Sequence, residues 1–232
     1  MINKKKVIAI IPAREGSKGI IDKNIRILGE KPLLAWPIDI AKQSKYIDRI
    51  IVSTDGEKIN NVAKEFGAEV IKRPKSLSQD DSLVIDAIKY TINELKNQGD
   101  KIDFVVILEA TSPLRNVDDV DSIIELLLEY DSAATFVEAS LNPHRAWKIN
   151  GNYVTTFLEG VTPWLPRQKL PTAYQLNGAV YGFRVDGLNG NSISPLFGNI
   201  APVIMPPERS LDIDNEIDFL IAEIIIKEQK NV

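Results

Sequence analysis

Short runs of apolar, often β-branched residues recur along the chain and alternate with segments of helical periodicity. Such a run is typical of a parallel strand that is covered on both faces. We predict strands at residues 7–11, 49–53, 68–71, 104–108, 133–137 and 178–184. Helices are predicted at about residues 32–44, 57–66, 83–98, 117–130 and 216–227. This alternation indicates βαβ units, and therefore an α/β domain with a mainly parallel sheet.

Two segments depart from the regular pattern. Pro37 lies inside the first predicted helix, which should therefore be kinked there or begin later. After about residue 138 the alternation stops, and Asn150-Gly151-Asn152 between two short apolar stretches predicts a hairpin. We interpret residues 138–174 as an excursion from the sheet, an arm that packs on another subunit. Residues 1–232 are expected to form a single domain that includes this excursion.

The segment after the first predicted strand carries the most informative chemistry. Gly16 and Gly19 allow close backbone approach, and Arg14, Lys18 and Lys23 can neutralise an anion. The loop is suited to a triphosphate, although it is neither a Walker A loop nor a G-x-G-x-x-G dinucleotide loop. A solvated basic loop after an edge strand is the alternative interpretation.

Three polar segments follow the carboxyl ends of predicted strands, at residues 14–24, 53–55 and 109–115. Ligands of open α/β sheets bind at that edge, so we expect the three segments to converge there.

Asp212 and Asp214 form a candidate metal site, because carboxylates two residues apart in an extended segment face the same side. Oxygen ligands of this kind favour Mg²⁺ together with substrate phosphates. Alternatively, one aspartate caps the last helix and the other is solvated. The buried-type residues Leu211 and Ile213 between them favour a strand with an acidic face.

Composition narrows the function classes. The net charge of −4 argues against bulk nucleic-acid binding, and the absence of cysteine excludes disulfides and thiolate metal sites. A single histidine, His144, cannot build a histidine-rich zinc site. The apolar run at residues 7–11 is too short for a signal peptide or a membrane span, so we expect a cytoplasmic protein without a membrane partner.

Six segments together resemble the CMP-sialic acid synthetase family, the CMP-N-acylneuraminate and CMP-legionaminate cytidylyltransferases. The opening segment reads Ile-Pro-Ala-Arg-x-Gly-Ser-Lys-Gly-Ile from residue 11, with Lys23-Asn24 after it. The others are Arg73-Pro74 with Leu77 and Ser82, Thr111-Ser112-Pro113-Leu114-Arg115, Arg167-Gln168, Asn177-Gly178-Ala179-Val180-Tyr181 and Arg209-Ser210-Leu211-Asp212-Ile213-Asp214. They occur in the order in which the family has them and span nearly the whole chain.

The resemblance implies a fold, a reaction and a set of site residues. The fold would be a Rossmann-like three-layer α/β/α structure of the nucleotide-diphospho-sugar transferase type, with a small dimerisation arm at residues 138–174. The reaction would transfer CMP from CTP to a nine-carbon 2-keto sugar acid. CTP would be held by Ala13, Arg14, Gly16, Ser17, Lys18, Lys23, Asn24, Arg73 and Ser82. The sugar acid would be held by Glu109, Arg167, Gln168 and Asn177, and Mg²⁺ by Asp212 and Asp214.

Within this set, Arg14, Lys18, Asp212 and Asp214 are expected to act in catalysis. The family forms homodimers, so a dimer, or a larger assembly built on it, is expected here. Glu109 stands where most sialic acid enzymes have glutamine. An ionised carboxylate only accepts hydrogen bonds, whereas an amide also donates them, so legionaminic acid is as plausible a substrate as N-acetylneuraminate. A CMP-Kdo synthetase and a catalytically idle nucleotide-sugar binding protein are the alternatives.

Overall fold

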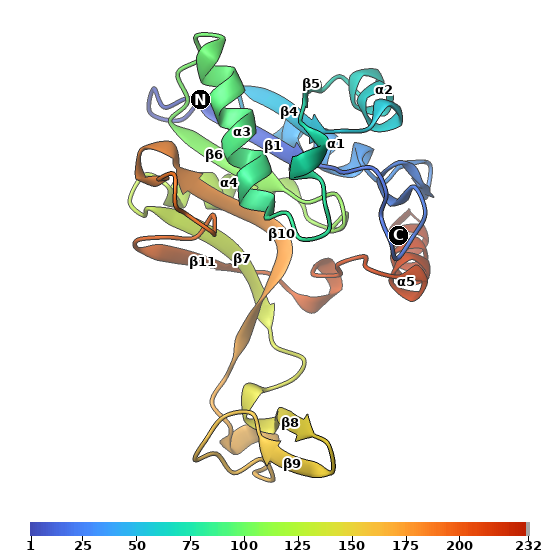
Figure 1. Ribbon diagram of the computed structural model, residues 1–232, viewed down its shortest axis with the longest axis vertical. Helices are drawn as coiled ribbons and strands as arrows, with labels where there is room; N and C mark the ends of the chain where they lie inside the picture. The colour runs from blue at the N-terminus through green and yellow to red at the C-terminus, as the bar shows by residue number, and fades with distance from the viewer. Residues whose placement is uncertain (231–232) are drawn as a thin grey trace.

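The computed structural model describes residues 1–230, whose centre is one seven-stranded sheet (Figure 1). Its strands are β1 (Val7–Pro12), β4 (Arg49–Thr54), β5 (Glu69–Lys72), β6 (Phe104–Leu108), β7 (Ser132–Glu138), β10 (Tyr174–Arg184) and β11 (Ile200–Ile204). They are ordered β11-β7-β10-β6-β1-β4-β5. Only β10 runs against its neighbours in this sheet, because its pairings with β6 and β7 are antiparallel and the others are parallel.

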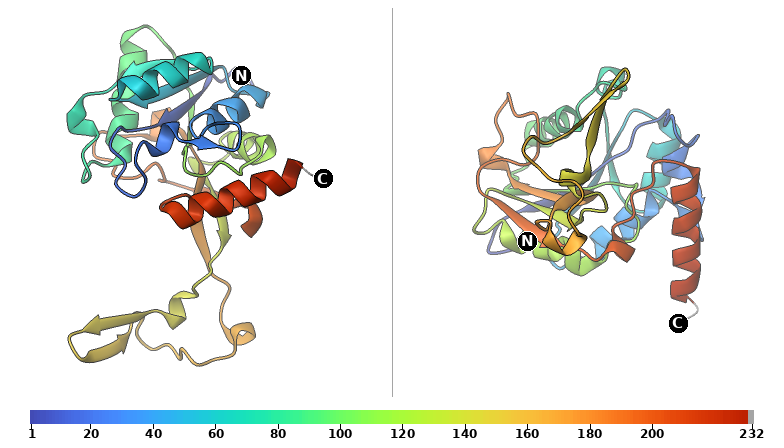
Figure 2. Two further views of the ribbon diagram at one scale, coloured as in Figure 1. Left: turned by 90° about the vertical axis from the view of Figure 1, so that its right-hand side faces the viewer. Right: turned by 90° about the horizontal axis from the view of Figure 1, so that it is seen from below.

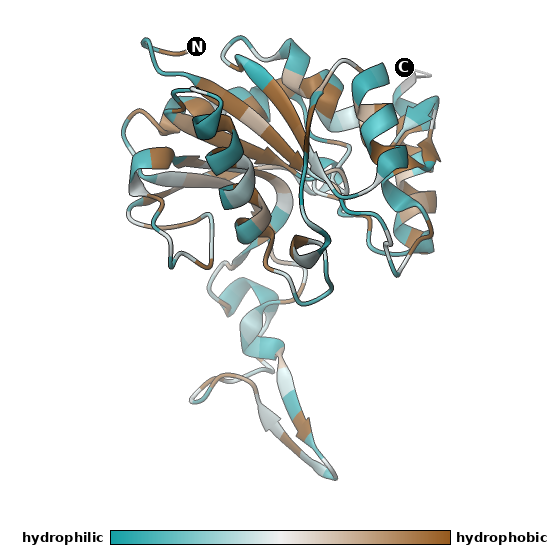
Figure 3. Ribbon diagram, turned by 45° about the horizontal axis from the view of Figure 1, so that its top comes forward, coloured by the Kyte–Doolittle hydropathy of each residue, from teal (hydrophilic) through white to brown (hydrophobic). Residues whose placement is uncertain are grey.

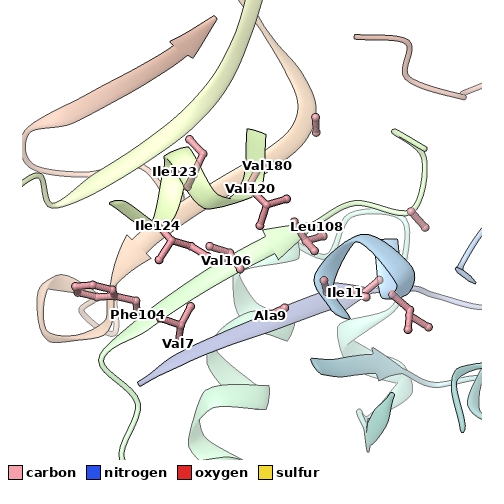
Figure 4. Close-up of a cluster of buried hydrophobic side chains, with 14 of the residues drawn as sticks. Val7, Ala9, Ile11, Phe104, Val106, Leu108, Val120, Ile123, Ile124 and Val180 are labelled. Carbon is pink, nitrogen blue, oxygen red and sulfur yellow. The ribbon is translucent and has the colours of Figure 1, made fainter. Parts of the chain in front are cut away.

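Helices cover both faces of the sheet. The alternation of side chains along β1 sends Val7, Ala9 and Ile11 to one apolar cluster and Ile8 and Ile10 to the other. The first cluster includes α1 (Ala35–Gln43), α2 (Glu57–Glu65) and α4 (Val117–Leu126), and Figure 4 shows part of it. The second cluster includes α3 (Val84–Asn97). The expected three-layer, mainly parallel α/β/α fold is thus confirmed.

The last helix, α5 (Glu216–Lys230), lies outside these layers and packs on the chain that follows β1 (Figure 2). That chain forms a small hairpin of β2 (Ile27–Leu28) and β3 (Lys31–Pro32). Leu28 and Leu33 bury their side chains against Phe219 and Ile226 in a third apolar cluster. Because of this packing, the segment that leads into α5 is held beside the loop after β1.

An arm extends from the sheet between β7 and β10 and ends in the hairpin of β8 (Trp147–Asn150) and β9 (Tyr153–Thr156) (Figure 1). The predicted hairpin is confirmed: Asn150, the last residue of β8, pairs with Tyr153, and Gly151 and Asn152 form the turn between them. Hydrophobic positions lie along this hairpin, far from the apolar layers of the sheet (Figure 3). Several apolar or aromatic side chains of the arm are largely exposed, among them Ile149 at 73%, Tyr153 at 80% and Trp164 at 85%.

The structure corrects the bounds of two predicted helices. The first begins at Ala35, which confirms the alternative of a later start, so Pro32 lies in β3 and Pro37 is the third helical residue. The backbone N–H groups of a first turn have no partner within the helix, so a proline there costs no hydrogen bond. The helix predicted to end at Tyr130 ends at Leu126, where tight turns take over.

One strand of the central sheet was missed, and one predicted strand does not form. β11 was missed because Pro202 lies within it, a residue that is tolerated there since β11 is an edge strand. The segment with Asp212 and Asp214 is no strand; Ile213 makes one backbone hydrogen bond, to the carbonyl of Thr111 at 2.8 Å, and no ladder follows. Within residues 1–230, no helix is long and apolar enough to cross a membrane.

Candidate active site

The loop after β1 is fastened at several points by hydrogen bonds. The Glu15 N–H donates to Asp55 Oδ1 at 3.1 Å, which ties the loop to the end of β4. The Asn24 amide donates to the Arg14 carbonyl at 3.0 Å and draws the two ends of the loop together. Gly16 has a φ of 78°, a left-handed conformation that glycine adopts without strain. These contacts anchor the start of the loop at Arg14 and Glu15 to its far end at Asn24 and to the end of β4.

This loop forms one wall of an open cleft of about 390 Å³ at the carboxyl edge of the sheet. Most of the predicted site residues line it: Arg14, Ser17, Lys18, Lys23, Asn24, Arg73, Ser82, Glu109 and Asp214. Gly16 lines a smaller adjoining recess, and Ala13 is buried at the base of the loop. The convergence expected from the strand ends is therefore observed for the loops after β1 and β6.

The opposite wall is the segment between β5 and α3. The Arg73 side chain is buried and its Nε donates to Ser78 Oγ at 2.8 Å. Burial lowers the pKa of Arg73, but a guanidinium stays charged at neutral pH. The Ser82 hydroxyl donates to the Ser76 carbonyl at 3.0 Å and so shapes this wall. Asp80 from the same segment reaches across the cleft to the loop after β1.

An acidic group lies where the sheet ends. Glu109 follows β6, and burial raises its pKa to about 7, with a further contribution from the charge of Asp212. Burial also raises the pKa of Asp212. The segment carrying Asp212 is held by Arg209, which forms a two-point ion pair at 3.1 Å with the buried Asp119 of α4.

Two observations at Asp212 and Asp214 fit a divalent cation. Asp212 Oδ1 is buried and has no hydrogen-bond partner among the described residues, so one carboxylate oxygen is available as a ligand. Lys23 Nζ donates to the Ile213 carbonyl at 2.7 Å and lies 3.7 Å from Asp214 Oδ1, which keeps Asp214 at the cleft. Within residues 1–230, no three acidic or histidine side chains gather to hold a metal alone. Mg²⁺ characteristically takes one or two carboxylates plus substrate phosphates, so this sparse ligand set suits it.

Three of the four residues predicted to bind the sugar lie away from the cleft of their own chain. Arg167 and Gln168 are on the arm, where the Arg167 side chain is 76% exposed and pairs with Glu138 at 3.0 Å. The Asn177 side chain is buried in the fold, where its Oδ1 accepts a hydrogen bond from Thr135 at 2.7 Å. Glu109 alone of this group lines the cleft.

The structure adds two residues to which the sequence gave no ligand-binding role. Burial raises the pKa of Tyr181 to about 12, and the charges of Glu109 and Asp212 add to the shift, which places the phenol near both carboxylates. Arg115 is fully buried, and its Nη2 donates to the Glu109 carbonyl. Its Nε and Nη1 have no hydrogen-bond partner within the described chain, and its charge is offset by the nearby carboxylates of Glu109, Asp119 and Asp212.

Comparison with known proteins shows that the chain is similar to cytidylyltransferases. The model of the cytidylyltransferase family matches residues 8–193. The chain is similar to the post-translational flagellin modification protein B of Campylobacter coli, with 33% identity over 96% of each chain. It is 32% identical to the CMP-N,N'-diacetyllegionaminic acid synthase of Campylobacter jejuni, over 95% of this chain and 94% of that one.

A longer relative and a solved structure extend the comparison. The N-acylneuraminate cytidylyltransferase of Escherichia coli is 32% identical over 97% of this chain, which spans about half of the relative's length, 53%. Among solved structures, a CMP-2-keto-3-deoxy-manno-octonic acid synthetase complexed with CTP superposes with a TM-score of 0.72. It is 17% identical, with 97% of this chain and 100% of the other covered, so this likeness shows the fold alone.

Proposed function

This chain belongs to the cytidylyltransferase family, and we propose that it transfers CMP from CTP to the anomeric hydroxyl of a nine-carbon 2-keto sugar acid, with release of pyrophosphate. The observation that carries the proposal is the cleft itself. It joins the cationic loop after β1 to the carboxylates of Glu109 and Asp214 at the carboxyl edge of the sheet. The sialic or legionaminic class of acid is supported by relatives with those names at similar identity.

The cations of the cleft have a direct role in such a transfer. The sugar hydroxyl attacks the α-phosphorus of CTP and gives its proton to water, the bond from that phosphorus to the bridging oxygen breaks, and pyrophosphate leaves. Negative charge accumulates on phosphate oxygens, so groups that bind these oxygens in the transition state accelerate the reaction. Arg14, Lys18 and Lys23 provide the positive charges on the cleft wall. The reaction needs no covalent enzyme intermediate.

We further propose that Asp212 and Asp214 hold Mg²⁺. When bound, such an ion neutralises phosphate charge and polarises the reacting oxygens. The protein residues keep the two carboxylates in position: Arg209 anchors their segment to α4, and Lys23 holds the Ile213 carbonyl. Arg115 lies behind the acidic group, where its charge favours the ionised form of Glu109.

Glu109 is proposed to select the sugar. Its side chain is mostly buried at the cleft, and burial raises its pKa to about 7, so the carboxyl carries a proton in much of the population at neutral pH. In that form it donates one hydrogen bond and accepts others, as the glutamine of sialic acid enzymes does. Protonated Glu109 can therefore hydrogen-bond to the hydroxyl or acetamido groups of a legionaminic-type acid and to those of N-acetylneuraminate.

The arm is proposed to pair with a second copy of this chain. Its apolar and aromatic side chains, including Ile149, Tyr153 and Trp164, are exposed, and the arm lies away from the layers of the sheet (Figure 3). Arg167 and Gln168 also lie on the arm, so their predicted contact with the sugar acid would take place in the partner's cleft. A homodimer in which each arm completes the other site accounts for both features. A cytoplasmic location stays a prediction from the sequence.

Pyrophosphate release tests the activity. The enzyme is incubated with CTP, Mg²⁺ and one of four acids: N-acetylneuraminate, legionaminate, pseudaminate or Kdo. Asp212→Asn should abolish release, while Asp118→Asn, which removes an exposed carboxylate from the first turn of α4, should leave it unchanged. Glu109→Gln should alter the ratio between the acids. Release with Kdo alone would establish the eight-carbon alternative, and CTP binding without release from any acid would favour the idle binding protein.

Mixed dimers test the shared site. Arg167→Ala and Asp212→Asn are each expected to lose activity. When the two variants are mixed under conditions that exchange subunits, one of the two clefts in each heterodimer has both residues intact. About a quarter of wild-type activity should return. If Arg167 acts on the cleft of its own chain, the mixture stays inactive.

A further inference from the structure

Asp80 is the acidic residue that faces the cationic loop across the cleft. Its Oδ1 lies 2.9 Å from Arg14 Nη1, and its Oδ2 lies 2.5 Å from Lys18 Nζ. Each carboxylate oxygen thus contacts a different cation. In the proposed reaction, Arg14 and Lys18 bind phosphate groups of CTP.

The contact joins two walls of the cleft. Asp80 belongs to the segment between β5 and α3, whereas Arg14 and Lys18 follow β1. Arg14 Nη1 also donates to the Ser78 carbonyl at 3.3 Å, so two acceptors of one short segment hold the same guanidinium. Both cations lower the pKa of Asp80, with Lys18 contributing most, which keeps the carboxylate ionised at neutral pH.

We propose that the Asp80 carboxylate is an internal counter-anion. It occupies the position of a phosphate group while the cleft is free of nucleotide, and CTP binds by displacing it. The inference rests on the proposed function in one respect, that a triphosphate is the ligand of this loop. It adds that the protein itself competes for the site. Residues 78–82 then act as a strap that opens when the phosphate chain takes over Arg14 and Lys18.

The geometry favours an Asp80 that CTP displaces over an Asp80 that stabilises the site permanently. The Asp80 side chain is 51% exposed and the Lys18 side chain 76% exposed, so neither is fixed by packing. Exposed ion pairs contribute little to stability, and their loss is readily compensated by a more highly charged ligand. A carboxylate brings one negative charge to the two cations, whereas a triphosphate brings several. The exchange should therefore favour CTP, with a small cost for breaking the internal contact.

Calorimetric titration of Asp80→Asn measures that cost. Asparagine keeps the shape of the side chain and removes its charge, and Asp81→Asn is the matched control, because it removes the neighbouring exposed carboxylate. Asp80→Glu keeps the charge. Each protein is titrated in metal-free buffer with CTP, with inorganic tripolyphosphate and with cytidine, which has no phosphate. Thermal melting checks that each variant is folded.

We expect Asp80→Asn to bind CTP and tripolyphosphate roughly threefold to tenfold more tightly than wild type, as the loss of two exposed ion pairs predicts. Cytidine affinity should not change, and Asp81→Asn and Asp80→Glu should remain within about twofold of wild type. The difference should shrink as salt is raised, because these pairs are exposed.

Unchanged or weaker CTP binding by folded Asp80→Asn would overturn the inference while leaving the proposed function intact. Tighter binding by Asp81→Asn to the same extent would also overturn it, because the effect would then come from general charge. If wild-type protein binds neither CTP nor tripolyphosphate, either in this buffer or with Mg²⁺ added, the proposed function fails and the inference fails with it. Should Asp80→Asn melt early, Asp80→Ser provides the same comparison with a smaller side chain.

Discussion

Gly19 lies so close to the acidic segment that no side chain fits between them. A Cβ atom at this position would lie 2.3 Å from the carbonyl oxygen of Asp214. Real Cβ contacts essentially never fall under 3.0 Å, so Gly19→Ala must separate the two backbones by at least about 0.7 Å. Both contacting groups are backbone, which means that no flexible side chain can absorb the change.

The expected consequence is a loss of activity that exceeds the loss of stability. The displacement moves Asp212 and Asp214 away from Arg14 and Lys18, the two halves of the proposed site. A misplacement of about 1 Å costs on the order of a hundredfold in rate. We therefore expect kcat/KM to fall by roughly 30- to 100-fold, which corresponds to about 2–3 kcal/mol of transition-state stabilisation. The substitution removes no side chain from the apolar cluster under α5, but two members of that cluster, Ile20 and Ile213, flank the contact, so some loss of stability accompanies the loss of activity.

The assay is pyrophosphate release with CTP and the acid that supports turnover. Gly190→Ala is the matched control, because a Cβ there meets no atom within 4 Å and the residue does not have a positive φ. Melting curves accompany the kinetics. Full activity in a well-folded Gly19→Ala enzyme would show that the two segments can separate without harm, and would refute the assignment of Asp212 and Asp214 to the reaction.

Three further predictions concern stability. Gly182→Ala would place a Cβ 2.5 Å from an isoleucine methyl of α4, and such overpacking costs about 1–3 kcal/mol, so the melting temperature should fall by roughly 2–12 °C while Gly190→Ala has no effect. Asn116→Ala removes the capping box of α4 and should cost about 1 kcal/mol, read as a fall of roughly 2–4 °C. The hydrogen bond from Lys6 lowers the pKa of Asp100 below its usual 3.8. The stability contributed by the Asp100–Lys6 pair is thus present above pH 3.8 and is lost as the pH falls below it. Asp100→Asn should therefore have a lower melting temperature than wild type at pH 7, and this difference should narrow on acidification.

Much of the sheet could be predicted because its strands are apolar on both faces. The β1 and β6 runs have no polar residue to obscure them, and the Gly-rich loop after β1 marks where the first run ends. β11 was harder, since an edge strand with Pro202 and exposed residues has no such pattern. The same physical difference separates the helices: α3 has a regular apolar stripe, whereas the start of α1 depends on a small hairpin that only tertiary contacts stabilise.

The candidate site was predictable to the extent that it depends on strand ends. Arg14 and Glu109 follow β1 and β6 directly, so the order of the strands brings them together. Tyr181 could not be assigned, because its place beside Glu109 depends on the antiparallel register of β10 on β6. The acidic pair was found by its spacing, but its proposed strand was wrong: burial of Ile213 between two loops gives the same alternation.

The contact between the loop after β1 and the segment before α5 has a consequence for biosynthesis. Lys23 and Ile213, which hydrogen-bond across the cleft, are 190 positions apart in the chain. At about 5–20 residues per second, a ribosome needs roughly 10–40 s to make the intervening chain. During that interval the nascent polypeptide carries its phosphate-binding loop but not the acidic residues that complete the cleft. Products whose translation stops before Asp212 are therefore expected to be inert, because the cleft can act only once this segment has been made.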